Sequence, residues 1–172
     1  MSLLLSGESI ELRETQRSEL SALLDVYNSN PGYNRLRHGS DAVTLTEVAA
    51  EYDSTLDIPT GHWLTVAAGD RIIGVMHIIV SNPADRKSWI SVLLLHADFQ
   101  RKGYGREAVR LAEAYFAQAG GLHVHHGVMA LNEPALLFWG KLGYEQYRQV
   151  HAPVGRLMQP VLLVAKWLQP FS

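Results

Sequence analysis

The segment Gln100–Arg106, which reads Gln-Arg-Lys-Gly-Tyr-Gly-Arg, is the part of the sequence best equipped to bind an anion. It follows the apolar run Trp89–His96, which is typical of a buried strand, and it precedes a stretch with helical spacing of apolar residues. Glycines at a helix start leave backbone N–H groups open to a phosphate. Arg101, Lys102 and Arg106 add positive charge. The segment therefore predicts a phosphate-binding loop between a strand and a helix.

Two other nucleotide-binding loops compete with this interpretation. Gly103-x-Gly105-x-x-Ala108 also fits the Rossmann fingerprint, which would make the chain a nucleotide-dependent oxidoreductase that binds NAD. That fingerprint places its first glycine directly after the strand, whereas Ala97–Lys102 intervene here. It also expects an acidic residue about 20 positions further on, where this chain has His123–Gly127. The P-loop pattern G-x-x-x-x-G-K-[ST] is absent.

A second block, Asn132-Glu-Pro-Ala-Leu-Leu-Phe-Trp-Gly-Lys-Leu-Gly-Tyr144, lies roughly 30 residues after the loop. The loop pattern Gln100-x-x-Gly103-x-Gly105 resembles the acetyl-CoA pyrophosphate loop of the GNAT N-acetyltransferases. The second block is similar to that family's pattern of Asn, Ala, Phe-Tyr and Leu-Gly-Phe. The resemblance is sharp over residues 88–144 and rests on the order of elements before them.

The resemblance implies an N-acetyltransferase that uses acetyl-CoA as co-substrate and acetylates an amine, on a small molecule or a peptide, by direct transfer in a ternary complex. Backbone N–H groups of the strand around Leu93 are expected to bind the oxyanion. The residues expected to contact the coenzyme are Leu93, Leu95, Gln100, Arg101, Lys102, Gly103, Tyr104, Gly105, Arg106, Asn132, Phe138, Trp139 and Lys141. The acceptor is expected near the loop after the first helix, Asn28–His38, where Tyr33 and Arg37 are exposed candidates.

The residues for proton transfer depart from the family pattern. Trp139 stands where many relatives carry an acid tyrosine, and an indole cannot protonate a thiolate. Trp89 and Ser91 stand where many relatives carry a basic carboxylate. A water chain, a substrate group or His77 could stand in for them. A histidine among apolar strand residues, however, is more often a hydrogen-bonded core residue. The alternative function is therefore a catalytically silent coenzyme-A-binding module with the same fold.

A metal site is not expected. On a strand, His123 and His125 share one face and His126 points to the other. No Asp, Glu or Cys stands nearby in the sequence as a further ligand.

The predicted elements give the order strand, two helices, three strands, helix, strand, helix and two strands. They are strands at Ser9–Arg13, Trp63–Ala68, Ile72–Ser81, Trp89–His96, Leu122–Met129, Gln146–His151 and Val161–Trp167, and helices at Glu19–Tyr27, from Thr44 toward Tyr52, after Gly105 and from Pro134 to Gly143. The turn residues Asn28–Gly32, which include Pro31, should end the first helix, Thr44 and Glu47 form a capping box for the second, and Asn132 caps the last. A loop is expected between Pro153 and Pro160. The fold class is α/β (α+β): one acetyltransferase domain, 1–172, with a GNAT-like mixed sheet of about seven strands and about four helices. Strands four and five, joined by a helix, should be parallel and, by the resemblance, splayed apart.

Composition narrows the function classes further. The chain has 172 residues, of which 47% are apolar and 19% charged, with a formal charge of −2 and no cysteine. These values indicate a globular protein with no electrostatic footprint for nucleic acid. No run approaches the roughly 18 apolar residues that span a bilayer, so no membrane partner is expected. The absence of cysteine suits the cytoplasm. The oligomeric state, including a homodimer, is left open.

Overall fold

The computed structural model describes residues 2–168. Their strands form one mixed eight-stranded sheet in the order β1-β2-β3-β4-β5-β6-β8-β7. Every neighbouring pair is antiparallel except β5 and β6, which are parallel. The strands are β1 (Leu4–Ser6), β2 (Glu11–Glu14), β3 (Gly61–Ala68), β4 (Arg71–Ile79), β5 (Ser88–Leu95), β6 (His123–Met129), β7 (Glu145–Val154) and β8 (Leu157–Trp167). The predicted fold class and the parallel pair are confirmed.

The helices pack on both faces of the sheet and enclose two apolar clusters. They are α1 (Leu20–Asn28), α2 (Pro31–His38), α3 (Leu45–Leu56), α4 (Tyr104–Gln118) and α5 (Glu133–Lys141), with short 3₁₀ turns at Arg17–Glu19 and Ala97–Phe99. Helices α4 and α5 contribute to the cluster that contains Ile90 and Phe116. Helices α1 and α3 contribute to the other cluster, which contains Trp63 and Val92. None of the described helices is both long and apolar enough to cross a bilayer.

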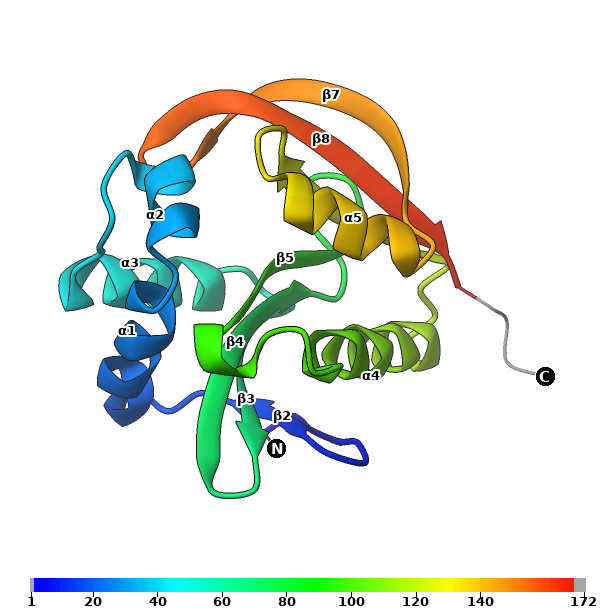
Figure 1. Ribbon diagram of the computed structural model, residues 1–172. Helices are drawn as coiled ribbons and strands as arrows, with labels where there is room; N and C mark the ends of the chain where they lie inside the picture. The colour runs from blue at the N-terminus through cyan, green and yellow to red at the C-terminus, as the bar shows by residue number, and fades with distance from the viewer. Residues whose placement is uncertain (1, 169–172) are drawn as a thin grey trace.

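The parallel strands β5 and β6 separate soon after they begin. They pair only at Ser88 with Val124 and at Trp89 with His125. From Ile90 onward β5 stays paired with β4 alone, and Figure 1 shows β5 between α1–α3 on one side and α4–α5 on the other. The divergence opens the sheet between its two halves and confirms the expected splay.

Three segments differ from the sequence-based expectations. Leu4–Ser6 forms an additional edge strand, β1. The segment expected as a loop after the first helix contains α2. Pro31 does not prevent this helix, because it lies in the first turn of α2, where the missing N–H costs nothing. The expected Pro153–Pro160 loop is mostly strand, with only Gly155 and Arg156 between β7 and β8. Pro160 lies where β8 passes the end of β6; its carbonyl accepts from the N–H of Ala130 at 3.0 Å, and the residues before it pair with β7 alone, a position that tolerates proline.

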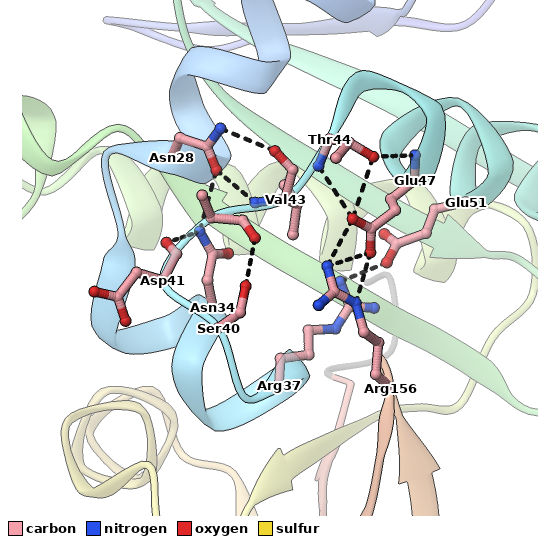
Figure 2. A network of polar contacts seen from close by, with 11 residues as sticks. Asn28, Asn34, Arg37, Ser40, Asp41, Val43, Thr44, Glu47, Glu51 and Arg156 are labelled. Atoms are coloured by element: carbon pink, nitrogen blue, oxygen red, sulfur yellow. Dashed lines mark hydrogen bonds and ion pairs between the residues drawn. The ribbon is translucent and has the colours of Figure 1, made fainter.

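The β7–β8 hairpin arches across the molecule and ends against α2 and α3 (Figure 1). Its tip is held by the backbone N–H of Arg156, which donates to the carbonyl of Arg37 at 3.1 Å. The Arg156 guanidinium also binds Glu47 on α3 through both carboxylate oxygens (Figure 2). Glu47 belongs to the predicted capping box with Thr44, which is confirmed. The hairpin therefore fixes α2 and α3 relative to the C-terminal half of the sheet.

Candidate functional site: two neighbouring cavities on β5

A cavity of about 610 Å³ occupies the opening between β5 and β6. Its walls come from the end of β5, the loop after it, the start of α4 and one side of α5. The lining residues are Asn30, Tyr33, Leu93, Leu94, Leu95, Gln100, Arg101, Gly103, Gly105, Arg106, Asn132, Pro134, Ala135, Phe138, Trp139, Lys141 and Leu142. Two segments that are about 30 residues apart in the sequence thus meet at one cavity.

The loop before α4 has the backbone that an anion site needs. Gly103 caps the helix with φ +89°, a left-handed conformation that favours glycine, and a side chain there would point into open space. The next glycine, Gly105, lies against Phe138, since an added Cβ would come within 3.2 Å of that ring. The first N–H groups of α4 have no partner within the helix. Together with the Arg101 and Arg106 side chains, these groups give the cavity a positive end.

The side chain of Gln100 ties this loop to the segment between α1 and α2. Its amide donates to the carbonyl of Leu95 at 2.9 Å and to the side-chain oxygen of Asn30 at 2.7 Å. The Asn30 amide donates to the same Leu95 carbonyl at 3.0 Å. Ser29 accepts a hydrogen bond from the N–H of Ala97 at 3.0 Å. The end of β5, the phosphate-type loop and the start of α2 are therefore held as one unit.

The backbone of β5 presents donors to the same cavity. The N–H of His96 donates to Ile73 on β4 at 2.8 Å. Because N–H groups of successive residues in an antiparallel strand point to opposite edges, those of Leu93 and Leu95 point away from β4, toward the opening left by β6. A carbonyl lying along the cavity would find these donors.

A second cavity, of about 390 Å³, lies on the other side of β5 beneath α3. It is lined by Arg37, Ala50, Glu51, Ser54, Thr55, Ile58, His77, Ser91 and Val92. Ser91 is the extra residue of a β-bulge, because His77 pairs with Val92 and Ile78 pairs with Ile90. The bulge turns the Ser91 side chain outward, where it is exposed although its neighbours on β5 are not.

His77 is buried at this second cavity, with 3% of its surface exposed. Its ring packs on Trp63 at a centroid distance of 3.6 Å, and its Nε2 has no hydrogen-bond partner among residues 2–168. Burial, assisted by the positive charge of Arg37, lowers the pKa of His77 well below its usual value. The imidazole is therefore neutral at pH 7. It is a core histidine, as expected, but its Nε2 has no hydrogen bond within the described residues.

Arg37 and Glu51 form the charged part of the second cavity. Arg37 Nη1 lies 2.8 Å from Glu51 Oε1, with only 12% of the arginine side chain exposed (Figure 2). The N–H is poorly aligned with that oxygen, so the nitrogen has no hydrogen-bond partner in the described part of the chain. Burial acts to lower the pKa of Arg37, but the neighbouring Tyr33, Glu51 and Tyr27 raise it overall. The expectation that Arg37 and Tyr33 are exposed is wrong: neither is exposed, and Tyr33 packs against the cluster that contains Trp63.

Comparison with known proteins identifies the family. Residues 21–144 match the family model described as "Acetyltransferase (GNAT) family". The chain belongs to the GNAT acetyltransferase family. This match covers both sequence blocks that line the larger cavity. A comparison with curated protein sequences finds no significant match.

Solved structures of GNAT proteins share the fold at low sequence identity. An acetyltransferase from Thermus thermophilus is 20% identical, with a TM-score of 0.78, covering 94% of this chain and 98% of that one. An enzyme of Salmonella typhimurium that modifies the N-terminal serine of ribosomal protein L7/L12 is 12% identical, with a TM-score of 0.82, covering 97% and 100%. Spermidine N-acetyltransferase from Vibrio cholerae, solved with CoA and spermine, is 16% identical, with a TM-score of 0.73, covering 94% and 96%.

Trp139, which stands where the resemblance led us to expect a tyrosine, is a wall of the larger cavity and is only 3% exposed. It packs against His126, Phe138 and Tyr144 at centroid distances of 4.2, 5.3 and 4.9 Å. His126 in turn donates from Nδ1 to the carbonyl of Ile90 at 2.6 Å, just where β5 and β6 separate. Burial lowers the pKa of His126 to about 4, and the Ile90 carbonyl opposes this shift. Trp139 and His126 thus fill the base of the opening.

The remaining predicted residues fall into clear groups. Of the expected coenzyme contacts, only Lys102 and Tyr104 do not line the larger cavity. Both pack toward Phe99 instead, at 5.7 and 6.3 Å. Asn132 also caps α5 by accepting from the N–H of Ala135 at 3.3 Å, as the sequence predicted.

The histidines of β6 lie as expected from strand alternation. His125 shares a hydrogen bond of 2.7 Å with His123 and another of 2.8 Å with the hydroxyl of Tyr147, on the face opposite His126. Within residues 2–168, no three potential ligand side chains of the His, Cys, Asp or Glu type come together as a metal site.

Sequence reasoning missed Asn30 and Glu51. Each lies on a polar helix-rich surface segment with no motif of its own. Only the contacts with Gln100 and Arg37, made across the fold, distinguish them.

Proposed function

We propose that the chain, residues 1–172, is a single N-acetyltransferase domain that transfers the acetyl group of acetyl-CoA directly to an amine. The observation that carries this proposal is the larger cavity, whose positive end at Gly103–Arg106 and donor-lined edge at Leu93 and Leu95 suit a long ligand with phosphates at one end and a carbonyl at the other. Its volume lies within the range of small-molecule sites. The CoA-bound relatives share the fold.

The proposed division of labour follows from the position of each group. The α4 N-terminus, Arg101, Arg106 and Lys141 hold the phosphates, and Phe138 and Trp139 pack on the apolar arm of the coenzyme. When bound, the coenzyme supplies an acyl group activated as a thioester. The N–H of Leu93 stabilises negative charge on the carbonyl oxygen, an interaction worth about 2.7–4 kcal/mol in other enzymes. The amine nitrogen gains the acetyl group and loses a proton, while the sulfur leaves and is released as the thiol.

His77 is the proposed hydrogen-bond acceptor on the acceptor side of β5. The residue lines the second cavity, and its buried, neutral Nε2 has no other partner in the described residues. Its lowered pKa makes it a poor store for a proton, so water carries the proton away. The proposed enzyme needs no metal.

Trp139 supports a second candidate function, a coenzyme-A-binding module that does not catalyse transfer. The two functions are separated by mixing the protein with acetyl-CoA and amines and measuring free thiol. Thermal stabilisation by acetyl-CoA together with acceptor-dependent thiol release supports the enzyme. Stabilisation without thiol release for any amine favours the silent module, and no stabilisation, or greater stabilisation by NAD, refutes both.

A further inference from the structure

The smaller cavity is a neighbour of the larger one along a single strand. Ser91 and Val92 line the smaller cavity, and the next three residues of β5 line the larger one. Successive strand residues rise about 3.3 Å, so the two linings meet within one or two residues. The acceptor arrangement proposed below has a molecule seated in the smaller cavity extend its amine along β5 toward Leu93. The space of about 390 Å³ suits a molecule of amino-acid size.

The guanidinium of Arg37 has hydrogen-bonding capacity to spare at this cavity. A guanidinium carries five N–H donors in a planar fork that matches a carboxylate. Arg37 has one ion-pair partner in the described chain, Glu51, and its buried Nη1 is not aligned on that partner. The N–H donors of a nearly buried cation cost free energy when they have no acceptor. The oxygens of an entering carboxylate would be such acceptors.

The lining of the smaller cavity offers little negative charge to a ligand. Glu51 is the one carboxylate among the lining residues, and Arg37 already pairs with it. The other polar lining groups are the hydroxyls of Ser54, Thr55 and Ser91 and the neutral ring of His77. An acceptor with several ammonium groups would find no unpaired carboxylate in this lining. The cavity is therefore better matched to an anionic group than to a polycation.

We propose that the acceptor is a small primary amine that carries its own carboxylate, as a free amino acid does, and that Arg37 binds this carboxylate. The inference rests on the proposed acetyl transfer and adds the class of acceptor to it. In this arrangement the carboxylate lies against Arg37 and the hydroxyls, and the amine lies toward Leu93. Arg37 is then a specificity-determining residue rather than only a link between α2 and α3.

The test uses matched acceptors that differ in one group. Each common amino acid is compared with its carboxamide, which imitates the first residue of a peptide, and with its decarboxylated amine, which carries no anion. Thiol release gives kcat/KM for each, and binding of the same molecules to the CoA-loaded protein gives affinities. The carboxylate form of at least one amino acid is expected to be used roughly 10- to 100-fold better than its two matched partners, as for a hydrogen bond to a charged group.

Variants of the protein then test whether Arg37 causes the preference for acceptors with a carboxylate. Arg37→Gln with Glu51→Gln removes both charges, keeps the size of the side chain at position 51 and shortens the one at position 37, and it is expected to abolish the preference. Arg35→Gln is the matched control, since Arg35 lies on the same helix but pairs with Asp41 at the surface, with 61% of its side chain exposed. That variant should keep the preference. Acetyl-CoA stabilisation is recorded for every protein, so that loss of coenzyme binding is recognised separately.

Three results overturn the inference. One is equal or better binding and use of the carboxamides or amines across the whole series by a protein that acetyl-CoA stabilises. The second is a preference that persists in the double variant, which would leave Arg37 and Glu51 as a structural link only. The third is a preference that also disappears in Arg35→Gln. Absence of any stabilisation by acetyl-CoA in the unaltered protein would instead overturn the proposed function, and this inference with it.

Discussion

Gly103 and Gly120 offer a matched test of the coenzyme loop. They flank the two ends of α4, both have φ +89°, and a side chain at either position would meet nothing within 4 Å. Replacement by alanine therefore imposes the same left-handed strain at both sites, about 1–2 kcal/mol each. For a chain of this size, each substitution should lower the melting temperature by roughly 2–8 °C.

Only Gly103 lies at the larger cavity, so only Gly103→Ala should weaken acetyl-CoA binding. At 100 times its dissociation constant, acetyl-CoA should add about 2.7 kcal/mol to the unaltered protein and raise its melting temperature by roughly 5–10 °C. A tenfold loss of affinity leaves about 1.4 kcal/mol at the same concentration. The shift in Gly103→Ala should thus be about half that of the unaltered protein or less, whereas Gly120→Ala should retain the full shift.

The assay is a melting curve with and without acetyl-CoA for the three proteins, repeated over a range of ligand concentrations. Each variant serves as its own reference for the strain that the methyl group introduces. If the acetyl-CoA shift is the same in all three proteins, Gly103 serves only to begin a helix, and the assignment of the loop to phosphate binding is refuted. A loss that is equal in both variants would show that general destabilisation explains it.

The other predictions concern the surroundings of the loop. Asn30→Ala removes a partner of Gln100 and should raise the KM for acetyl-CoA roughly 3- to 10-fold with a smaller change in kcat; an unchanged KM would contradict the link. Turnover should survive chelators and dialysis, and stoichiometric zinc whose removal abolishes activity would contradict this. His126 has a pKa lowered to about 4, so below pH 6.5 the unfolded chain binds a proton that the folded chain does not. Denaturant unfolding should therefore show stability falling by up to about 3 kcal/mol between pH 6.5 and 4, and a His126→Gln variant should lose that part of the slope.

Local signals predicted much of the fold. The capping box at Thr44 and the asparagine cap at Asn132 involve residues three positions apart, so their meaning is readable from the sequence alone. Proline was the main source of error. Pro31 was interpreted as the end of a helix although it begins one, and Pro160 was placed in a loop although it lies in β8. In both cases the proline lies at a position where the fold needs no backbone N–H donor. The sequence alone does not show this.

The candidate site divides in the same way. The glycine-capped start of α4 was predictable because it depends on adjacent backbone groups and one glycine conformation, whereas its assignment to phosphate binding stays a prediction. The contacts of Asn30 with Gln100 and of Arg37 with Glu51 join different elements and follow no motif. In the sequence these residues resemble the ordinary polar surface of a helix. Their contacts arise only because α2 packs against α3 and the end of β5. The second cavity could therefore not be predicted from the sequence, although His77, which was a candidate base, is one of its lining residues.

Trp139 raises the question of how the departing sulfur obtains its proton. The indole N–H is a donor without an accessible acidic pKa, and the ring is enclosed by His126, Phe138 and Tyr144. A thiol has a pKa near about 8.5, so its thiolate is a moderate base that water can protonate at neutral pH. Trp139→Phe should therefore weaken coenzyme binding through lost packing and leave every ionisation of the wild-type pH–rate profile in place. Trp139→Tyr supplies an acidic hydroxyl and should speed turnover only if protonation of the sulfur limits the rate. The measurement is the pH dependence of kcat and kcat/KM for the three proteins. If Trp139→Phe removes an ionisation while the affinities stay unchanged, Trp139 orients the true acid, and a packing role alone is refuted.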